Sequence, residues 1–354
     1  MAEMLFSELR RLHSRSIDVN LIRPKFRNRF AAIARGSRFA IAAERALNRF
    51  FYYPRVVRGL RDRFDLFHIV DHSYAHLARE LPSNRTIVTC HDLDAFRCLL
   101  GEGEERRSWY PPVARRLLDG LSRASVVICG TRTTRDELAR RELVSDEKLV
   151  VIPYGLDSAC NAAPDIDADR EAEQMLAGRE HIDVLHVGST ISRKRIDVLL
   201  EIFAELRREI PAARLVRVGG PFTPEQEALL DRFSLRGAVV SLPFLSRRKL
   251  AAVYRRAAVL LLPSEAEGFG LPVIEALACG TPVVCSDLAV LREAGGEAAA
   301  YCPVGRVTDW VNAVRGILKE RGRFPDRSNA RREAGVTWAS RFSWTANASQ
   351  VASL

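Results

Sequence analysis

Two glutamates flank a glycine-rich turn in the second half of the chain. The segment Glu267-Gly-Phe-Gly-Leu-Pro-Val-Ile-Glu275 follows a short apolar run, Ala258 to Pro263, which predicts a strand buried in a parallel sheet. Gly268 and Gly270 allow the backbone to approach a ligand, and Pro272 favours a helix start. Free N–H groups at a helix start bind phosphate, whereas carboxylates accept hydrogen bonds from sugar hydroxyls. The turn is therefore predicted to hold a sugar and a phosphate together.

The same acids have a purely structural interpretation. Carboxylates near a helix start complement the helix dipole, and the glycines would then serve only the bend. That interpretation suffices for a single glutamate. Because two acids and two glycines surround one helix start, we favour a binding function.

Cations follow another predicted strand. Gly188 and Ser189 come directly after the strand Asp183 to Val187, and three successive cations at 193–195 then precede an amphipathic helix. Cations at the carboxyl end of a parallel strand are placed for a ligand. When a sugar leaves a nucleotide diphosphate, negative charge grows on the departing oxygen, and fixed cations stabilise it. A solvated run of charges is the alternative.

The stretch from Ser264 to Asp287 resembles the donor signature of the family 4 retaining glycosyltransferases, and the similarity extends from about residue 64 onward. The resemblance implies an α/β protein of GT-B fold, with two Rossmann-like doubly wound domains facing across a cleft. It also implies transfer of a sugar from a UDP-, GDP- or ADP-sugar to a glycan or lipid-linked acceptor, with retention of anomeric configuration. Synthesis of a cell-surface polysaccharide or glycolipid is the expected setting.

The resemblance assigns roles to single residues. Glu267 would face the transferred sugar, Glu275 would hold the nucleotide ribose, and Lys194 would bind the diphosphate. His91 follows the predicted strand Thr86 to Cys90 and is the catalytic candidate of the first domain, although a histidine after a strand also serves as a structural cap. The predicted catalytic residues are His91, Lys194 and Glu267, and the predicted donor-binding residues are Gly188, Ser189, Arg193, Lys194, Phe244, Leu245, Glu267, Gly268, Phe269, Gly270, Leu271 and Glu275. Asp71 and His72 form a second polar pair, which we assign to the acceptor.

Two departures from the family pattern stand out. The family often has arginine directly after the glycine where this chain has Ser189, so Arg193 or Arg195 would supply the second cation. The chain also opens with an amphipathic helix, Glu3 to His13, where a doubly wound domain normally has a strand and a glycine turn. The first domain is therefore predicted to lack its first strand. A truncated, catalytically impaired homologue or a partner subunit is the alternative function.

The chain of 354 residues exceeds what one hydrophobic core usually organises. Strands alternate with helices throughout, which predicts α/β domains with parallel sheets. The strands of the first domain are predicted at 66–70, 86–90, 125–129 and 149–152, and those of the second at 183–187, 214–218, 238–242 and 258–263. The polar, acidic stretch that begins at Asn161 is typical of a linker. The predicted organisation is an acceptor-side domain at 1–160, a linker at 161–180, a donor-binding domain at 181–335, and a C-terminal helix at 336–354 that crosses back to the first domain.

The net charge of +10 arises entirely at the amino end. Residues 1–64 hold fifteen Arg or Lys and five Asp or Glu, and the rest of the chain is balanced. The segment Arg23 to Phe30 interleaves cations with aromatics, which favours contact with an anionic membrane surface, although Phe26, Phe30 and Ile33 also have core-like spacing. A nucleic-acid binder is a weaker alternative, and no nucleic acid is expected as a partner. With no apolar run of membrane-spanning length and no signal-like start, a cytoplasmic location is predicted, with peripheral membrane contact.

Neither a metal nor another cofactor is expected. The seven cysteines are scattered without a CxxC pair, which is typical of reduced thiols. Asp165, Asp167 and Asp169 have the spacing of a DxD metal motif, as do Asp92 and Asp94. The first set falls in the predicted linker and lacks the glycine and terminal glutamate of a calcium loop. Fixed cations can supply the electrostatic stabilisation that a metal would give.

Overall fold

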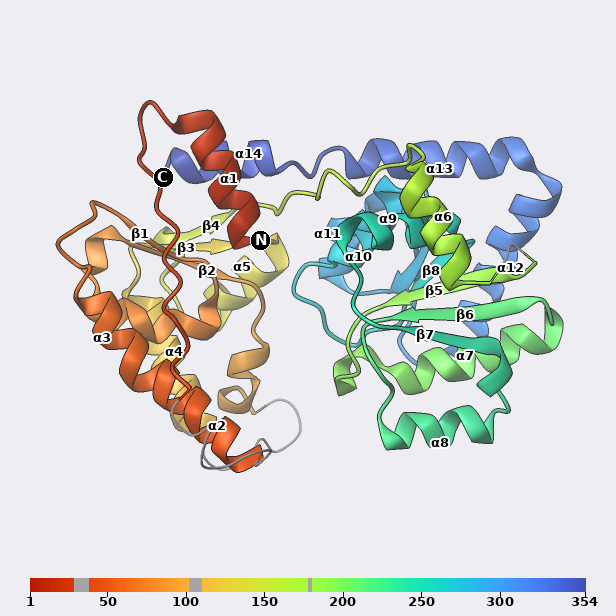
Figure 1. Ribbon diagram of the computed structural model, residues 1–354, viewed down its shortest axis with the longest axis horizontal. Helices are drawn as coiled ribbons and strands as arrows, with labels where there is room; N and C mark the ends of the chain where they lie inside the picture. Colours follow the sequence, from red (N-terminus) through yellow and green to blue (C-terminus); the bar gives the residue numbers. More distant parts are fainter. Residues whose placement is uncertain (29–37, 102–109, 178–179) are drawn as a thin grey trace. The chain divides into compact units, whose positions relative to one another are not determined.

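The computed structural model describes residues 1–28, 38–101, 110–177 and 180–354. The chain divides into two compact units, one of residues 1–154 with 347–354 and the other of residues 155–346. The predicted linker at 161–180 belongs to the second unit, where it contains helix α6 (Ile166–Met175). Each unit is built on its own parallel sheet (Figure 1).

The first unit has a four-stranded sheet in the order β1-β2-β3-β4, with every neighbouring pair parallel. Its strands are β1 (Phe67–Ile69), β2 (Thr86–Cys90), β3 (Val126–Cys129) and β4 (Leu149–Val151). All four match the predicted strands. The described residues before β1, at 1–28 and 38–66, contain no strand. The absence of the first strand of a doubly wound domain stays a prediction, because residues 29–37 lie outside the described residues.

Helices pack on both faces of this sheet. The helices of the first unit include α1 (Ala2–His13), α2 (Arg38–Leu47), α3 (Tyr53–Arg58), the 3-10 helix η2 (His72–Glu80), α4 (Tyr110–Arg123), α5 (Arg132–Arg140) and the end of α14 (Trp344–Ala352). On one face, Leu117 of α4 is buried in a cluster with Val88 of β2 and Ala75 of η2. On the other face, Ile128 of β3 packs in a cluster with Val351 of α14. The last residues of the chain therefore complete the core of the first unit.

The second unit has a six-stranded parallel sheet in the order β10-β9-β8-β5-β6-β7. Its strands are β5 (Ile182–Val187), β6 (Ala213–Val218), β7 (Val239–Leu242), β8 (Val259–Leu262), β9 (Val283–Ser286) and β10 (Ala300–Cys302). Strands β5 to β8 match the predicted strands, whereas β9 and β10 have no predicted counterpart. Two Rossmann-like parallel α/β sheets are thus present, as predicted for the fold class.

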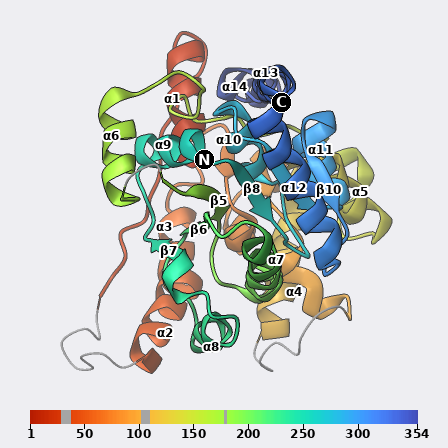
Figure 2. The same cartoon turned by 90° about the vertical axis from the view of Figure 1, so that its right-hand side faces the viewer.

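The helices of the second unit form two layers around this sheet. They are α6, α7 (Ile196–Glu209), α8 (Pro224–Arg232), α9 (Arg247–Arg256), α10 (Leu271–Ala278), α11 (Ala289–Gly295), α12 (Val307–Arg323) and α13 (Pro325–Ala339). Helix α7 lies beside α12 on one face (Figure 2), where Phe203, Trp310 and Val314 are buried against Leu215 and Leu261. Helices α9 and α10 lie on the opposite face (Figure 1). The sheet is therefore buried on both sides, which explains its continuous apolar runs.

The predicted C-terminal helix at 336–354 consists of two helical pieces. Helix α13 ends at Ala339, and α14 begins at Trp344. No helix among the described residues is long and apolar enough to cross a membrane. All seven cysteines are free, and six of them are buried.

Two helical glycines allow a test of the packing. A Cβ on Gly120 of α4 would lie 2.0 Å from the carbonyl oxygen of Ala75, whereas a Cβ on Gly316 of α12 would meet nothing within 4 Å. We expect Gly120→Ala to lower the free energy of unfolding by about 1–3 kcal/mol because the helix must shift from the backbone of η2. Gly316→Ala should raise it by about 0.5–1 kcal/mol. Thermal unfolding followed by circular dichroism measures both, and equal melting temperatures would contradict this packing.

Candidate functional site

The order of the strands in the second unit reverses at β5. The chain runs outward from β5 through β6 to β7, then crosses to β8 on the other side of β5 and continues to β9 and β10. Ligands of open parallel sheets bind outside the carboxyl ends of the strands at such a reversal. The segments that follow β5 and β8, residues 188–194 and 263–270, carry most of the predicted donor-binding residues.

Lys194 and Glu267 join these two segments. The Nζ atom of Lys194 lies 2.5 Å from Oε1 of Glu267, and the Ser264 hydroxyl donates to the same oxygen at 2.7 Å. Both side chains are largely buried, with 10% of the lysine and 6% of the glutamate exposed. A buried carboxylate requires such partners because an unpaired charge is strongly disfavoured away from water. The pair fixes an ammonium group at the strand reversal.

Arg193 adds a second cation to this pair. Its Nη1 atom lies 3.6 Å from Oε2 of Glu267 and donates to the carbonyl oxygen of Ala266 at 2.8 Å. The backbone N–H of Glu265 donates to the carbonyl oxygen of Arg193 at 2.9 Å, which ties the two turns together. Two cations therefore share one carboxylate, and the cluster carries a surplus positive charge suited to an anion.

Glu275 lies on α10 and is buried, with 5% of the residue exposed. Arg247 donates from Nη1 to Oε1 at 2.9 Å, and the Tyr254 hydroxyl donates to Oε2 at 3.0 Å. Burial raises the pKa of the Glu275 carboxyl, while the charge of Arg247 and the Tyr254 hydrogen bond oppose that shift. Each carboxylate oxygen has two lone pairs, so the group retains acceptor capacity for a ligand hydroxyl.

The turn before α10 presents backbone rather than side chains. Phe269 is buried, and its ring packs edge-on against Phe342 with 5.8 Å between centroids. Gly270 caps the helix with φ of +93°, and Pro272 takes the second helical position rather than the first. Of this turn, Leu271 and Gly268 are half-buried. The predicted contact of this turn with a ligand is therefore restricted mainly to backbone amides.

The predicted residues after β5 and β7 lie near the same sheet edge. Gly188 and Ser189 are half-buried directly after β5. Phe244 is 78% exposed after β7, and Leu245 beside it is half-buried. A Cβ on Gly220 would lie 3.8 Å from the Phe244 ring, so this aromatic side chain stands over the turn after β6. An exposed ring at this position is suited to stacking on a flat ligand group.

His91 belongs to the first unit, where it follows β2. Its Nδ1 atom lies 2.6 Å from the Tyr154 hydroxyl, and its backbone N–H donates to Nδ1 of His72 at 3.1 Å. Burial and the neighbouring His72 lower the pKa of His91, although Asp71 and Asp92 oppose that shift. The ring is therefore neutral at physiological pH and can exchange hydrogen bonds but not charge. His72 of the second polar pair lies beside it, with 5.8 Å between the ring centroids. The assignment of Asp71 and His72 to the acceptor stays a prediction.

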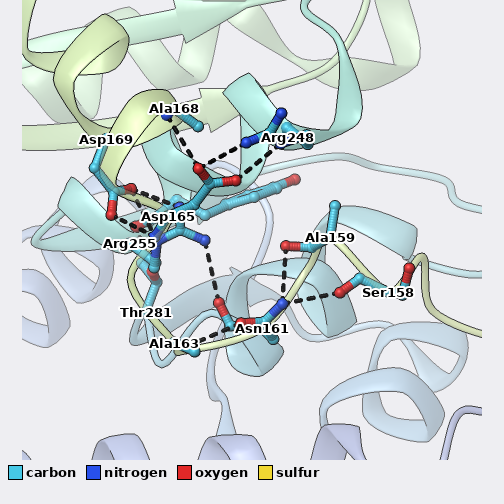
Figure 3. A network of polar contacts seen from close by, with 11 residues as sticks. Ser158, Ala159, Asn161, Ala163, Asp165, Ala168, Asp169, Arg248, Arg255 and Thr281 are labelled. Atoms are coloured by element: carbon cyan, nitrogen blue, oxygen red, sulfur yellow. Dashed lines mark hydrogen bonds and ion pairs between the residues drawn. The ribbon is translucent and has the colours of Figure 1, made fainter.

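The aspartates of the DxD motif hold helices together. Asp165 caps α6 and accepts two hydrogen bonds from Arg248 at 2.8 and 2.9 Å (Figure 3). Asp169 accepts a hydrogen bond from Arg255 (Figure 3). Both arginines belong to α9, so α6 is fastened to the helix that also carries Arg247. No group of three or more His, Cys, Asp or Glu among the described residues could hold a metal ion. Metal independence of the reaction stays a prediction.

Three residues of the site have no counterpart in the predicted set. Ser264, Arg247 and Tyr254 each bond one of the two key glutamates. Arg247 and Tyr254 lie seven positions apart, two turns of α9, which places both on one face of that helix. The sequence shows that Arg247 and Tyr254 share one face of a helix. It does not show that this face contacts α10, because β8 separates α9 from α10 along the chain.

Comparisons with known proteins show the family and the fold to which the chain is similar. The family model described as glycosyltransferase family 4 matches residues 1–159, and the model described as glycosyl transferases group 1 matches residues 167–335. The D-inositol 3-phosphate glycosyltransferase of Rhodococcus opacus is 32% identical over 281 residues, which cover 76% of this chain and 61% of that protein. The protein of the same name from Mycobacteroides abscessus is 30% identical over 75% of this chain and 60% of its own length. The chain thus spans about three fifths of the length of these relatives.

Solved structures show the same fold. Sucrose-phosphate synthase from Thermosynechococcus elongatus matches with a TM-score of 0.69 and 24% identity, covering 85% of this chain and 76% of that protein. HepE from Anabaena, solved in complex with UDP and glucose, matches with a TM-score of 0.72 and 18% identity, covering 87% and 82% respectively. These similarities place the two Rossmann-like sheets among GT-B structures.

The environment of Glu275 generates a pH-dependent prediction. Because burial raises its pKa above the ordinary value of 4.5, the ionised carboxyl lowers folding stability above the folded-state pKa, and this effect fades as the pH falls toward 4.5. Glu275→Gln should therefore melt at a higher temperature than the unmodified protein at pH 7.5, with a smaller difference at pH 5.

A matched control is Asp183→Asn. Asp183 is buried between Arg214 and Arg256, so its neutralisation leaves buried cations unpaired and should lower the melting temperature at pH 7.5. Scanning calorimetry at the two pH values measures both variants. A Glu275→Gln melting temperature below that of the unmodified protein at pH 7.5 would refute the prediction.

Proposed function

The chain belongs to glycosyltransferase family 4, and we propose that it transfers a sugar from a nucleotide diphosphate to an acceptor with retention of anomeric configuration. The observation that carries the proposal is the Lys194–Glu267 pair at the reversal of strand order, with Arg193 beside it. A carboxylate that can accept hydrogen bonds from sugar hydroxyls, Glu267, thereby lies beside two cations that can bind a diphosphate. A sugar diphosphate requires both kinds of group.

The chemistry follows from this charge arrangement. The bond between the anomeric carbon and the diphosphate oxygen breaks, and Lys194 and Arg193 stabilise the negative charge that develops on the departing oxygen. The acceptor oxygen attacks the anomeric carbon from the same face, and its proton passes to the leaving phosphate. Glu267 accepts hydrogen bonds from sugar hydroxyls, and Glu275 accepts from the ribose. Catalysis rests on positioning and charge, with no metal.

The donor and the first-unit residues complete the proposal. HepE is described in complex with UDP-glucose, which favours a UDP-sugar over GDP- and ADP-sugars. Phe244 would cover the nucleotide base, and backbone amides of the turn from Gly268 to Leu271 would bind sugar and diphosphate. His91, as a neutral ring, would donate or accept one hydrogen bond at the transferred sugar.

Two acceptor classes follow from different observations. The relatives are named for D-inositol 3-phosphate, which favours a phosphorylated polyol. The basic amino end favours instead a lipid-linked or glycan acceptor of a cell-surface polysaccharide or glycolipid. We propose the phosphorylated polyol as the first acceptor to test, because the named relatives align over three quarters of this chain.

Membrane contact is supported by the surface of the first unit. The backbone of Arg27 exchanges two hydrogen bonds of 2.8 Å with the Asn48 side chain, and its guanidinium lies 3.7 Å from the centre of the Tyr52 ring. Phe26 and Phe51 on these neighbouring segments are 51% and 57% exposed. Exposed aromatic side chains among cations are typical of protein surfaces that bind an anionic membrane. Of the predicted segment, Arg29 and Phe30 lie outside the described residues.

The transferase proposal is tested with Lys194→Ala. UDP-, GDP- and ADP-sugars are first screened for thermal stabilisation, and transfer is then measured to D-inositol 3-phosphate and to lipid-linked glycans, with and without EDTA. We expect Lys194→Ala to lower kcat/KM by at least about a hundredfold, to undetectable transfer, because the leaving oxygen loses its cation. Product NMR reports the anomeric configuration.

Arg195→Ala is the matched control. This neighbouring cation pairs with Asp197 at 2.8 Å and Glu265 at 3.5 Å, away from Glu267, and its loss should leave transfer nearly unchanged. Circular dichroism confirms folding of both variants. Unaltered rates in Lys194→Ala would refute its role, and absence of transfer by the unmodified protein despite nucleotide binding would favour an impaired homologue or a partner subunit.

The membrane proposal is tested by flotation with vesicles. We expect the protein to float with vesicles of phosphatidylglycerol but not of phosphatidylcholine, and Phe26→Ser with Phe51→Ser to lower the bound fraction several-fold. Ile166→Ser is the control, since Ile166 is 74% exposed in the second unit. Equal binding to both vesicle types, or none to either, would contradict membrane contact through this surface.

A further inference from the structure

Arg217 of β6 is buried without a carboxylate partner. Its exposed fraction is 0%, and burial alone lowers the pKa of its guanidinium. Among the residues that the structure describes, no acidic side chain lies within ion-pair distance of it. Arg214, three positions earlier on the same strand, is also buried but lies 2.7 Å from Asp183. Two buried arginines of one strand thus differ in whether their charge is neutralised.

The guanidinium of Arg217 instead binds carbonyl groups of two glycine turns. Its Nη1 atom donates to Gly220, and its Nη2 atom lies 3.3 Å from the carbonyl oxygen of Gly188 and 3.5 Å from that of Gly219. The Phe222 ring covers it, with 4.7 Å between Cζ and the ring centre. One side chain therefore holds both the turn after β5 and the turn after β6.

These two turns lie in direct contact. Gly219 has φ of +140°, and a Cβ there would lie 1.9 Å from the carbonyl oxygen of Gly188. The peptide bonds are trans, so the carbonyl groups of Gly188 and Gly219 that face Arg217 direct the N–H of the next residue the opposite way. Those N–H groups belong to Ser189 and Gly220, and neither has an acceptor among the described residues. The third carbonyl group, that of Gly220, precedes Pro221, which has no N–H. Arg217 thereby aims two unused amide donors away from the sheet interior.

His186 pairs with Arg217 across β5 and β6. Its Nδ1 atom lies 3.0 Å from the carbonyl oxygen of Leu261 and must donate, so Nε2 is an acceptor, which is buried without a partner among the described residues. Burial lowers the pKa of His186 to about 3, which leaves the ring neutral. The histidine therefore does not alter the net charge beneath the turns, which comes from Arg217.

We propose that Arg217 is a positioning residue for the donor diphosphate: it orients the amides of Ser189 and Gly220 toward the ligand and supplies a buried positive charge that the diphosphate neutralises. This inference rests on the proposed function. A buried, unneutralised charge lowers the stability of the ligand-free protein, and replacement of such a charge by an apolar side chain is often neutral or stabilising. A purely structural brace would behave in the opposite way.

The test compares Arg217→Met with Arg214→Met in the full chain. Calorimetry measures the Kd for UDP, and thermal unfolding measures the ligand-free melting temperature. We expect Arg217→Met to keep or raise the melting temperature and to raise the Kd about tenfold or more, equivalent to about 1.4 kcal/mol. Arg214→Met should lower the melting temperature, because Asp183 loses a partner, and leave the Kd unchanged.

Each outcome discriminates. A lower melting temperature with an unchanged Kd in Arg217→Met would overturn the proposal in favour of a structural brace. If that variant does not fold, Arg217→Lys, which keeps the charge but not the forked hydrogen bonds, should still raise the Kd, and an unchanged Kd would overturn the proposal. If the unmodified protein binds no nucleotide diphosphate, the proposed function fails, and this inference fails with it.

Discussion

The ion pair between Lys194 and Glu267 joins the two strands at which the sheet order reverses. The buried carboxylate of Glu267 needs cationic partners, and the segment after β5 supplies two of them, Lys194 and Arg193. The Ser264 hydroxyl donates a further hydrogen bond to the same carboxylate. The pair therefore fixes the turn after β5 to the turn before α10, and both face the sheet edge at which parallel α/β proteins bind ligands. Glu267 holds the cations in place without neutralising them all. The surplus positive charge and the local structure thus come from the same few atoms.

Charges buried around this edge differ in how completely they are balanced. Asp183 lies between two arginines at the amino end of the sheet and is fully paired. Glu275 has one arginine and one hydroxyl and keeps a raised pKa. Among the described residues, the polar partners of Arg217 are carbonyl oxygens, and none is a carboxylate. Incomplete neutralisation is thus found in Glu275 and Arg217 and not in Asp183.

Helix α9 connects the site with the segment that leads into the second unit. Arg248 and Arg255 fasten α6 through Asp165 and Asp169 (Figure 3). Arg247 of the same helix donates a hydrogen bond to Glu275. The aspartates that imitate a metal motif are thereby committed to arginines. A change that displaces α9 is expected to disturb both the entry segment and the environment of Glu275, because a helix moves as a rigid element.

Local signals in the sequence predicted the eight strands from β1 to β8 and helix α1, since apolar runs and glycine turns are short-range patterns. The roles of Glu267, Glu275 and Lys194 stay predictions. Family resemblance added the likeness to GT-B proteins. Only the tertiary structure decided which groups neutralise one another. Arg247 and Tyr254 contact Glu275, Asp165 and Asp169 bind arginines, and no acidic side chain among the described residues pairs with Arg217. Which charged side chains pair with one another depends on helices and strands that are far apart in the sequence and close in the fold. The spacing of residues along the chain does not determine which of these elements come into contact.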